Sequence, residues 1–180
     1  RRKFILEGIF THYATADGEE AAFVKQQQLF YELVGQHEFK YIHCCNSAAM
    51  AYHQDNKSNL GCIGIFMYGI DPAGSETKEF KQVMSLYSKV ALIKKIKAGD
   101  RVGYGLTYTA DEDEYLATIP IGYADGLIRK NQGRNVYING KYFEIVGRVC
   151  MDQIMVRVDE TIKEGDKVEI FGAHISLASM

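Results

Sequence analysis

The chain has 180 residues, of which 47% are hydrophobic and 24% charged, and its 21 basic and 23 acidic side chains give a net charge of −2. This composition excludes a mainly disordered chain, and the balanced charge argues against a nucleic-acid-binding protein that works by bulk charge. The longest apolar run, residues 60–70, is shorter than the roughly 20 residues of a membrane-spanning helix, and nothing near the start resembles a signal peptide. No membrane segment is therefore predicted.

Alternating strand and helix signals mark residues 1–83 as an α/β region. The expected strands are residues 4–11, which read as a buried strand, 41–45 and 62–67, and a short helix is expected at 46–52. Strands joined by helices form parallel sheets, and three strands are too few to close a barrel, for which eight is the common number. This region is therefore expected to need strands that the chain does not supply.

A longer helix is predicted between the first two strands. Asp17 is expected to be its N-cap, and Glu20, three residues on, would close a capping box. Gly35 is the predicted C-terminal stop, because glycine commonly ends helices. The expected apolar face of this helix carries Phe23, Phe30, Tyr31 and Val34.

The pattern changes near residues 80–86, and residues 84–180 are predicted to form a β-rich region. The expected strands are 85–96, 101–104, 115–121, 135–138, 142–146, 149–158 and 167–171. Asn139-Gly140 is a strong hairpin signal, and further turns are predicted at 98–100 and 165–166. Short strands at this spacing are typical of β-barrels and sandwiches. The predicted fold class is therefore α/β followed by all-β.

Three predicted strand ends in the first region carry side chains that could do chemistry, because active groups in parallel α/β folds gather at the carboxyl ends of strands. These ends hold His12, then His43, Asn46 and Ser47, then Gly64 and Ile65. The Ser47 hydroxyl and nearby backbone N–H groups would suit a phosphate, and a glycine lets an anion approach the backbone closely. The alternatives are an ordinary helix cap at Asn46-Ser47 and a satisfied core histidine at His12.

The four cysteines, Cys44, Cys45, Cys62 and Cys150, are read as reduced cytosolic thiols, since their spacing matches no C-x-x-C pattern. A metal site built from His43 and three of these thiols has no ligand spacing to support it. The chain begins without Met and ends within a strand-like pattern. We therefore expect a fragment of a longer protein.

The β-rich region holds three unusual strings, at residues 102–110, 119–126 and 146–153. Tyr104 stands between two glycines, which is a poor choice for a core tyrosine. Pro120 inside a predicted strand is costly unless it lies at an edge or a bulge. Each string alone is weak support for a function.

Together the motifs resemble the alanine racemase family. In chain order they are Thr-His-Tyr-Ala-Thr-Ala-Asp, His-x-x-Asn-Ser-Ala-Ala, Gly-Ile-x-Met-Tyr-Gly, Gly-Tyr-Gly-x-Thr-Tyr-Thr-Ala, Ile-Pro-Ile-Gly-Tyr-Ala-Asp-Gly and Val-Gly-Arg-Val-Cys-Met-Asp-Gln. The resemblance covers nearly the whole chain. It implies the last strands and helices of a (β/α)8 barrel in residues 1–83, followed by a truncated β-rich C-terminal domain in residues 84–180.

The resemblance also implies an activity: cytoplasmic homodimers that use pyridoxal 5'-phosphate (PLP) to interconvert L- and D-alanine for peptidoglycan. Racemisation needs a base on each face of the substrate Cα, and PLP stabilises the carbanion. By resemblance one base is a PLP-bearing lysine upstream of this chain, so the fragment alone is expected to be inactive. The other base is Tyr104, which acts in the partner subunit's site. A free tyrosine has a pKa of about 10 and needs help to act as a base, and His12 is the expected helper.

The remaining roles implied by the resemblance fall into three groups. Cofactor contacts are expected from Ser47, Gly64, Ile65, Asn46, His43 and Cys62; substrate contacts from Met151 (through its N–H), Asp152 and Tyr123; and the entrance channel from Asp17, Arg129 and Arg148. For the two arginines a solvated surface position is the alternative reading.

Cys62 departs from the family pattern, which has an arginine facing the pyridine nitrogen at this position. A neutral thiol cannot donate a strong charged hydrogen bond. Either the alignment slips locally and another cation takes this place, or the electronics of the cofactor differ. The alternatives for function are a serine/alanine racemase of the vancomycin-resistance type, a degenerate family member without activity, and a non-catalytic PLP-binding protein, against which the β-rich region argues.

Overall fold

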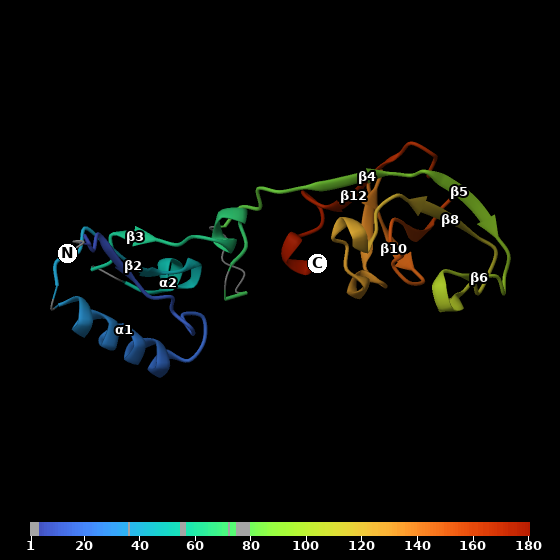
Figure 1. Cartoon of the computed structure of the whole chain (residues 1–180). Helices are drawn as coiled ribbons and strands as arrows, with labels where there is room; N and C mark the ends of the chain where they lie inside the picture. The colour runs from blue at the N-terminus through green and yellow to red at the C-terminus, as the bar shows by residue number, and fades with distance from the viewer. Residues whose placement is uncertain (1–3, 36, 55–56, 72, 75–79) are drawn as a thin grey trace. The chain divides into compact units, whose positions relative to one another are not determined.

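A computed structural model describes residues 4–35, 37–54, 57–71, 73–74 and 80–180 of the chain. The chain divides into two compact units, Arg1–Val83 and Met84–Met180. In Figure 1 the first unit is coloured from blue to green and the second from green to red. In the part of the chain that is described, no helix combines the length and the apolar character needed to cross a bilayer.

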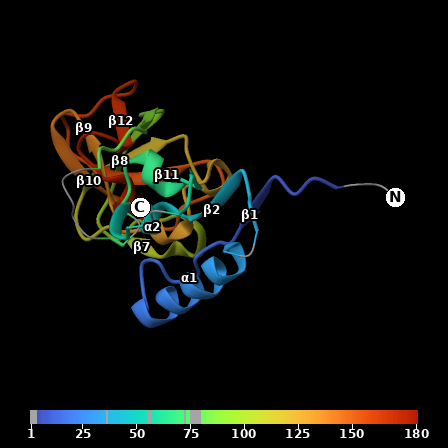
Figure 2. The same ribbon diagram turned by 90° about the vertical axis from the view of Figure 1, so that its left-hand side faces the viewer.

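The first unit is a parallel three-stranded sheet with two helices. Its elements are β1 (Gly8–Phe10), α1 (Glu20–Val34), β2 (Tyr41–Cys45), α2 (Ser47–Tyr52) and β3 (Leu60–Gly61). The sheet order is β1-β2-β3 and both pairings are parallel, which confirms the predicted parallel sheet. Figure 2 shows α1 running alongside β1 and β2.

The core of the first unit lies where α1 and α2 meet the sheet. Three residues of the predicted α1 face, Phe23, Phe30 and Val34, are buried, and Gly35 ends the helix as expected. They pack with Tyr13 and the thiol of Cys44, and both tyrosine hydroxyls near this thiol, from Tyr13 and Tyr31, lie 3.2 Å from its sulfur. All four cysteines are free thiols, and Cys62 alone among them is exposed.

Three predictions in this unit are wrong at the level of elements. Residues 4–7 form no strand, and Phe4, Ile5 and Leu6 are exposed. Helix α1 is capped by Glu19 without a side-chain hydrogen bond, because the chain first makes a turn in which Gly18 N–H donates to Thr15 O. The Asp17–Glu20 capping box does not form.

The third wrong element is the strand at 62–67. Pairing with β2 stops at Gly61, and Ile65–Tyr68 form a 3-10 helix instead. The N–H groups of Gly64 and Phe66 turn towards Ser47 rather than towards a neighbouring strand. Gly69, with φ of 76°, ends this short helix in the left-handed conformation that glycine tolerates.

The second unit is a curled antiparallel sheet. Its strands are β4 (Leu86–Lys89), β5 (Leu92–Ile96), β6 (Arg101–Val102), β7 (Tyr108–Thr109), β8 (Glu114–Ile119), β9 (Asn135–Ile138), β10 (Lys141–Val146), β11 (Ile154–Val158) and β12 (Lys167–Phe171). Seven of them pair in the order β4-β12-β9-β10-β11-β8-β5, and β6 pairs with β7. Only residues 90 and 91 separate β4 from β5, so the two edges of the sheet come from one bent segment and the sheet closes on itself.

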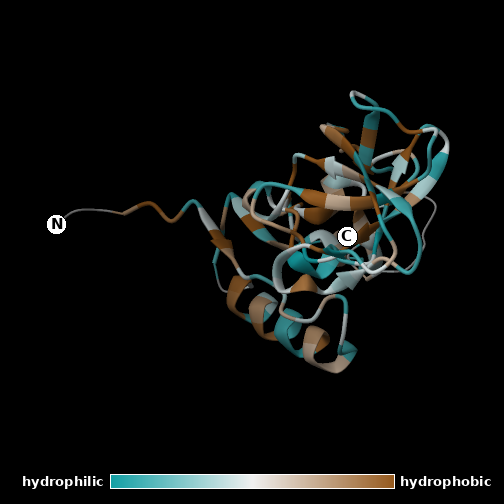
Figure 3. Ribbon diagram, turned by 90° about the vertical axis from the view of Figure 1, so that its right-hand side faces the viewer, coloured by the Kyte–Doolittle hydropathy of each residue, from teal (hydrophilic) through white to brown (hydrophobic). Residues whose placement is uncertain are grey.

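This closure corrects the predicted single strand 85–96. The strand divides at Val90, whose N–H donates to Asp166 O, while Ala91 N–H donates to Thr118 O on the other side. The interior of the curled sheet holds aliphatic side chains that are fully buried: Ala117, Ile119, Val136, Ile138, Ile154, Val156, Val168 and Ile170. Figure 3 shows bands of hydrophobic and hydrophilic residues following one another along the ribbon of the molecule, as expected for strands that bury one face.

The hairpin turn predicted at Asn139-Gly140 is present in this unit. Asn139 and Gly140, with φ of 47° and 90°, join β9 to β10 as predicted. Residues 149–153 are not part of a strand, contrary to the prediction for 149–158, because Cys150 O and Met151 O accept hydrogen bonds from Tyr123 and Ala124 N–H. The predicted strand 101–104 is shorter, the predicted strand 115–121 ends just before Pro120, and β7 was not predicted.

Candidate functional site

A cavity of about 410 Å³ lies in the first unit at the carboxyl ends of its strands. Its lining consists of His12, Asp17, Asn46, Ser47, Ala48, Cys62, Ile63, Gly64 and Ile65. The cavity thus brings together seven of the side chains or glycines singled out from the sequence. His43 is not among the lining residues; its ring stacks on Phe10 with centroids 5.3 Å apart.

Neutral hydrogen-bonding groups form one wall of this cavity. The Ser47 hydroxyl is nearly buried and accepts from Gly64 N–H at 2.9 Å and from Phe66 N–H at 3.5 Å. A Cβ at Gly64 would lie 3.9 Å from the Ser47 oxygen, which is an ordinary van der Waals contact. A hydroxyl and converging backbone N–H groups are the donor set that a phosphate takes.

Asn46 and His12 differ in how they are held. Asn46 caps α2, accepting from Ala49 N–H at 2.9 Å, and its Nδ2 donates to Tyr13 O at 3.1 Å. The helix-cap reading of Asn46 is therefore confirmed. His12 is exposed and lines the cavity, so the alternative of a satisfied core histidine is wrong.

Cys62 lines the cavity beside Ile63 and Gly64. The lining residues include no lysine or arginine from the described ranges. The described residues also include no cluster of three or more His, Cys, Asp or Glu side chains able to hold a metal ion.

In the second unit, Tyr104 stands at the tip of a tightly turned loop and is 73% exposed. Gly103, Gly105 and Leu106 all have positive φ, at 79°, 74° and 50°. Arg101 donates to Leu106 O at 2.8 Å, and a Cβ at Gly105 would lie 3.3 Å from the Arg148 guanidinium. The loop is thus held by Arg101 and lies close to Arg148, while the tyrosine side chain is exposed.

Tyr108, four residues on, has the opposite environment. Its hydroxyl donates to Glu114 Oε1 at 2.6 Å. Burial first, and then the hydrogen bond to Glu114, raise the pKa of Tyr108 to about 12. A phenol held in this way cannot serve as a base near neutrality. Of the two tyrosines in this string, only Tyr104 is free to act on a ligand.

Two further loops of the second unit pack on each other. Tyr123 and Ala124 N–H donate to Cys150 O and Met151 O at 3.0 and 2.9 Å. The Arg129 guanidinium lies 4.7 Å from the centre of the Tyr123 ring. Met151 and Asp152 are exposed on the same loop as Arg148. The structure therefore gathers Tyr123, Arg129, Met151 and Asp152 at one pair of loops.

The family descriptions that match the chain are "Alanine racemase, N-terminal domain" over residues 1–72 and "Alanine racemase, C-terminal domain" over residues 83–180. The alanine racemase of Ligilactobacillus salivarius (strain UCC118) is 48% identical over 172 residues, which make up 92% of this chain and 46% of that protein. That of Lactococcus lactis subsp. cremoris (strain SK11) is 44% identical, covering 92% and 47%. The chain spans about half the length of these relatives.

Solved structures agree with the sequence matches. Alanine racemase from E. faecalis superposes with a TM-score of 0.89 at 38% identity, covering 97% of this chain and 50% of that one. The Bacillus anthracis enzyme with bound L-Ala-P gives 0.86 at 39% identity, covering 94% and 48%. The Bartonella henselae enzyme with covalently bound pyridoxal phosphate gives 0.83 at 32% identity, covering 95% and 49%. With a partial barrel followed by a β domain, this chain belongs to the alanine racemase family.

Proposed function

We propose that the chain is the C-terminal half of a PLP-dependent racemase that interconverts L- and D-alanine and so supplies D-alanine for peptidoglycan. The observation that carries the proposal is the convergence of His12, Ser47, Cys62 and Gly64 on one cavity, together with the free, braced Tyr104. The complete enzyme is proposed to be a cytoplasmic homodimer, with Tyr104 of one subunit serving the other. The boundary between barrel and β domain is proposed at residues 83 and 84.

The cavity residues would hold the phosphate of PLP. The proposed donors are the Ser47 hydroxyl and the Ile65 N–H, and Gly64 N–H, which donates to the Ser47 oxygen at 2.9 Å, would orient that hydroxyl. Asn46 and Cys62 line the same cavity, and His43, which is outside the lining, is proposed as a further cofactor contact from β2. When bound, PLP supplies an electron sink for the negative charge that develops at the substrate Cα. Neutral donors orient a phosphate without adding charge to the site.

The second unit would bind the substrate and move its proton. Met151 N–H is proposed to hold the alanine carboxylate, with Asp152 and Tyr123 beside it. Tyr104 Oη takes or returns the α-proton on one face of the substrate, and His12 assists this phenol in the assembled site. The base for the other face is the lysine of the missing N-terminal half. Asp17, Arg129 and Arg148 would flank the entrance.

The test is racemisation of L-alanine and L-serine by the complete protein with added PLP, read by chiral chromatography. D-alanine as the main product supports the proposal, and comparable D-serine would favour a serine/alanine racemase. Tyr104→Phe should lower the rate by roughly 10²- to 10⁴-fold, the usual contribution of a general base. Tyr87→Phe, another exposed tyrosine of the second unit, is the control. No D-product from a PLP-loaded protein, or D-alanine from the 180-residue chain alone, would contradict the proposal.

A further inference from the structure

The loop that carries His12 is held by one glutamine of helix α1. Gln26 Nε2 donates to His12 O at 2.8 Å and to Thr11 Oγ1 at 3.1 Å, and Gln26 Oε1 accepts from Ala14 N–H at 3.0 Å. A primary amide has two N–H donors and one carbonyl acceptor. Both N–H donors and the carbonyl acceptor of the Gln26 side chain are therefore bonded to residues 11–14.

This arrangement matters because residues 11–19 join β1 to α1 without regular secondary structure. Two other side chains hold the far end of the loop: Asn46 donates to Tyr13 O, and His53 Nε2 donates to Ala16 O at 2.8 Å. Thr11 N–H donates to His43 O at 3.2 Å at the start of the loop, and between these anchors Gln26 holds the Thr11 hydroxyl, His12 O and Ala14 N–H. Gln26 is half-buried and belongs to a helix whose Phe23 and Phe30 lie in the core, so it is a fixed support.

The His12 imidazole itself makes no hydrogen bond within the described residues, and its side chain is exposed at the cavity. The backbone around His12 therefore sets where the imidazole starts from. Gln26 makes three of the hydrogen bonds that hold this backbone, alongside those from Thr11 N–H to His43 O and from Asn46 to Tyr13 O. We propose that Gln26 is a positioning residue, which aims the His12 imidazole so that it can assist Tyr104. This inference rests on the proposed racemase function and extends it to a residue outside the cavity lining.

The chain offers a matched control, because residues 26–28 are all glutamine. Gln28 is on the same helix and is exposed. Gln26→Ala removes the three hydrogen bonds, and Gln28→Ala imposes the same change of helix propensity without them. Gln26→Glu keeps the size and the acceptor for Ala14 but cannot donate to His12 O. This second variant separates lost positioning from lost packing if the alanine variant folds poorly.

The first readout is kinetic, in the complete PLP-loaded protein. We expect both Gln26 variants to lower kcat about tenfold or more per bound cofactor, the effect of losing roughly one net hydrogen bond at an aligned group. KM for L-alanine should change less than about twofold, and the pH profile of kcat should shift, because the phenol and its helper are misaligned. Gln28→Ala should match the unchanged protein. A merely structural role would lower melting temperature while leaving the pH profile of the folded fraction unmoved.

The second readout does not depend on activity. Amide hydrogen exchange at Ala14, whose N–H is bound by Gln26, should be roughly tenfold faster in Gln26→Ala and unchanged in Gln28→Ala. Faster exchange with an unchanged kcat and pH profile would overturn the positioning role, as would unchanged exchange. If the complete protein binds PLP but racemises nothing, the proposed function fails, and because positioning for catalysis rests on it, the inference fails with it. An active enzyme with normal Gln26 variants would overturn the inference alone.

Discussion

Gly122 lies where the loop at residues 120–126 packs against the loop at residues 147–153 in the second unit. A Cβ built on Gly122 would lie 2.4 Å from Cys150 O and 2.5 Å from the carbonyl carbon and oxygen of Met151. Its φ of −151° is extended backbone that any residue adopts. Space alone therefore requires glycine here, and the neighbouring atoms are backbone that cannot swing aside. Gly122→Ala must push the two loops apart.

The expected cost follows from these contacts. Overpacking against rigid neighbours costs about 1–3 kcal/mol. The hydrogen bonds from Tyr123 to Cys150 O and from Ala124 to Met151 O weaken as the loops separate, at about 1 kcal/mol each when lost. We expect a total near 3 kcal/mol, which corresponds to a fall in melting temperature of roughly 12–24 °C for a domain of this size. Under the proposed function, displacement of Met151 N–H should also raise KM for alanine in the complete protein.

The assay is calorimetric melting of the chain, with amide exchange in peptides from β8 and β11 identifying the transition of the second unit. Gly126→Ala is the control. Gly126 has a φ of 98° and no atom within 4 Å of a built Cβ, so it carries only the conformational cost of about 1–2 kcal/mol. The reasoning is refuted if Gly122→Ala destabilises the second unit no more than Gly126→Ala does.

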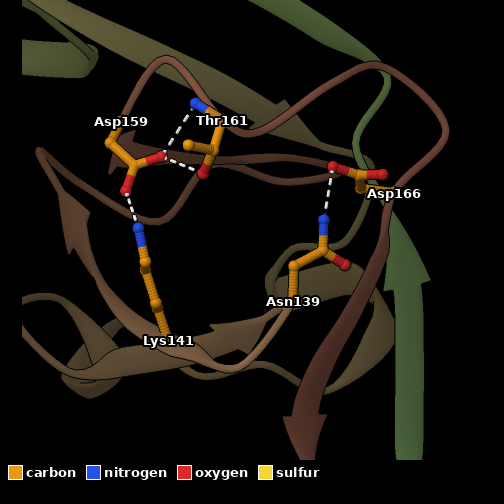
Figure 4. Close-up of polar contacts among 5 residues, drawn as sticks. All are labelled: Asn139, Lys141, Asp159, Thr161 and Asp166. Atoms are coloured by element: carbon orange, nitrogen blue, oxygen red, sulfur yellow. Dashed lines mark hydrogen bonds and ion pairs between the residues drawn. The ribbon is translucent and has the colours of Figure 1, made fainter.

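Three shorter predictions concern single groups. Iodoacetamide should label Cys62 in the native chain before the three buried cysteines, as mapped by mass spectrometry, and bound PLP in the complete protein should protect it. Asp159 accepts hydrogen bonds from Lys141 and Thr161, which Figure 4 shows. These bonds, with the one from Lys141 the larger cause, lower the pKa of Asp159 to about 2. The ionised carboxylate therefore stabilises the folded chain above the ordinary pKa of about 3.9, and this stabilisation is lost as the pH falls towards 2. In Asp159→Asn the free energy of unfolding, measured with urea, should depend less steeply on pH between about pH 4 and 2. Absorbance titration at high pH should show a phenol ionising near pH 12, and the difference between the unchanged chain and Tyr108→Phe should isolate this signal.

The strands that sequence predicted best have their boundaries set by local chemistry. β2, β9 and β12 begin and end at the predicted residues, because short β-branched and aromatic runs are followed there by polar or turn-forming residues. The Asn139-Gly140 pair prescribes the left-handed backbone of a two-residue hairpin, and the structure has it. Such signals act over a few residues, which is why a single sequence can show them.

The wrong elements have boundaries set by distant partners. Residues 62–67 are apolar enough for a strand, but Gly64 and Phe66 N–H bond to Ser47, 17 and 19 residues away. Residues 149–153 do not pair with a neighbouring strand because the carbonyls of Cys150 and Met151 accept hydrogen bonds from Tyr123 and Ala124 N–H instead. No local hydrophobic period distinguishes these segments from true strands.

The cavity residues could be predicted because their motifs are distinctive, whereas Gln26 could not. A glutamine within the run 26–28 has no composition or spacing signal, and only the fold shows that its amide meets His12 and Ala14. The candidate residues are marked by unusual residue types, such as Tyr104 between glycines. A residue that orients them can be any side chain of suitable length, so it is found by geometry.

The charge of the cavity lining indicates which contributions to phosphate binding this half of the proposed enzyme can make. Its ionisable lining residues are His12, Asp17 and Cys62, and the described residues place no lysine or arginine there. A phosphate monoester carries about −1.5 to −2 charge at neutral pH, and the proposed Ser47 and Ile65 donors are neutral. Under the proposed function, this half therefore fixes the geometry of the bound phosphate while the balancing positive charge comes from the rest of the enzyme. That division explains, in electrostatic terms, why we expect the 180-residue chain alone not to racemise alanine.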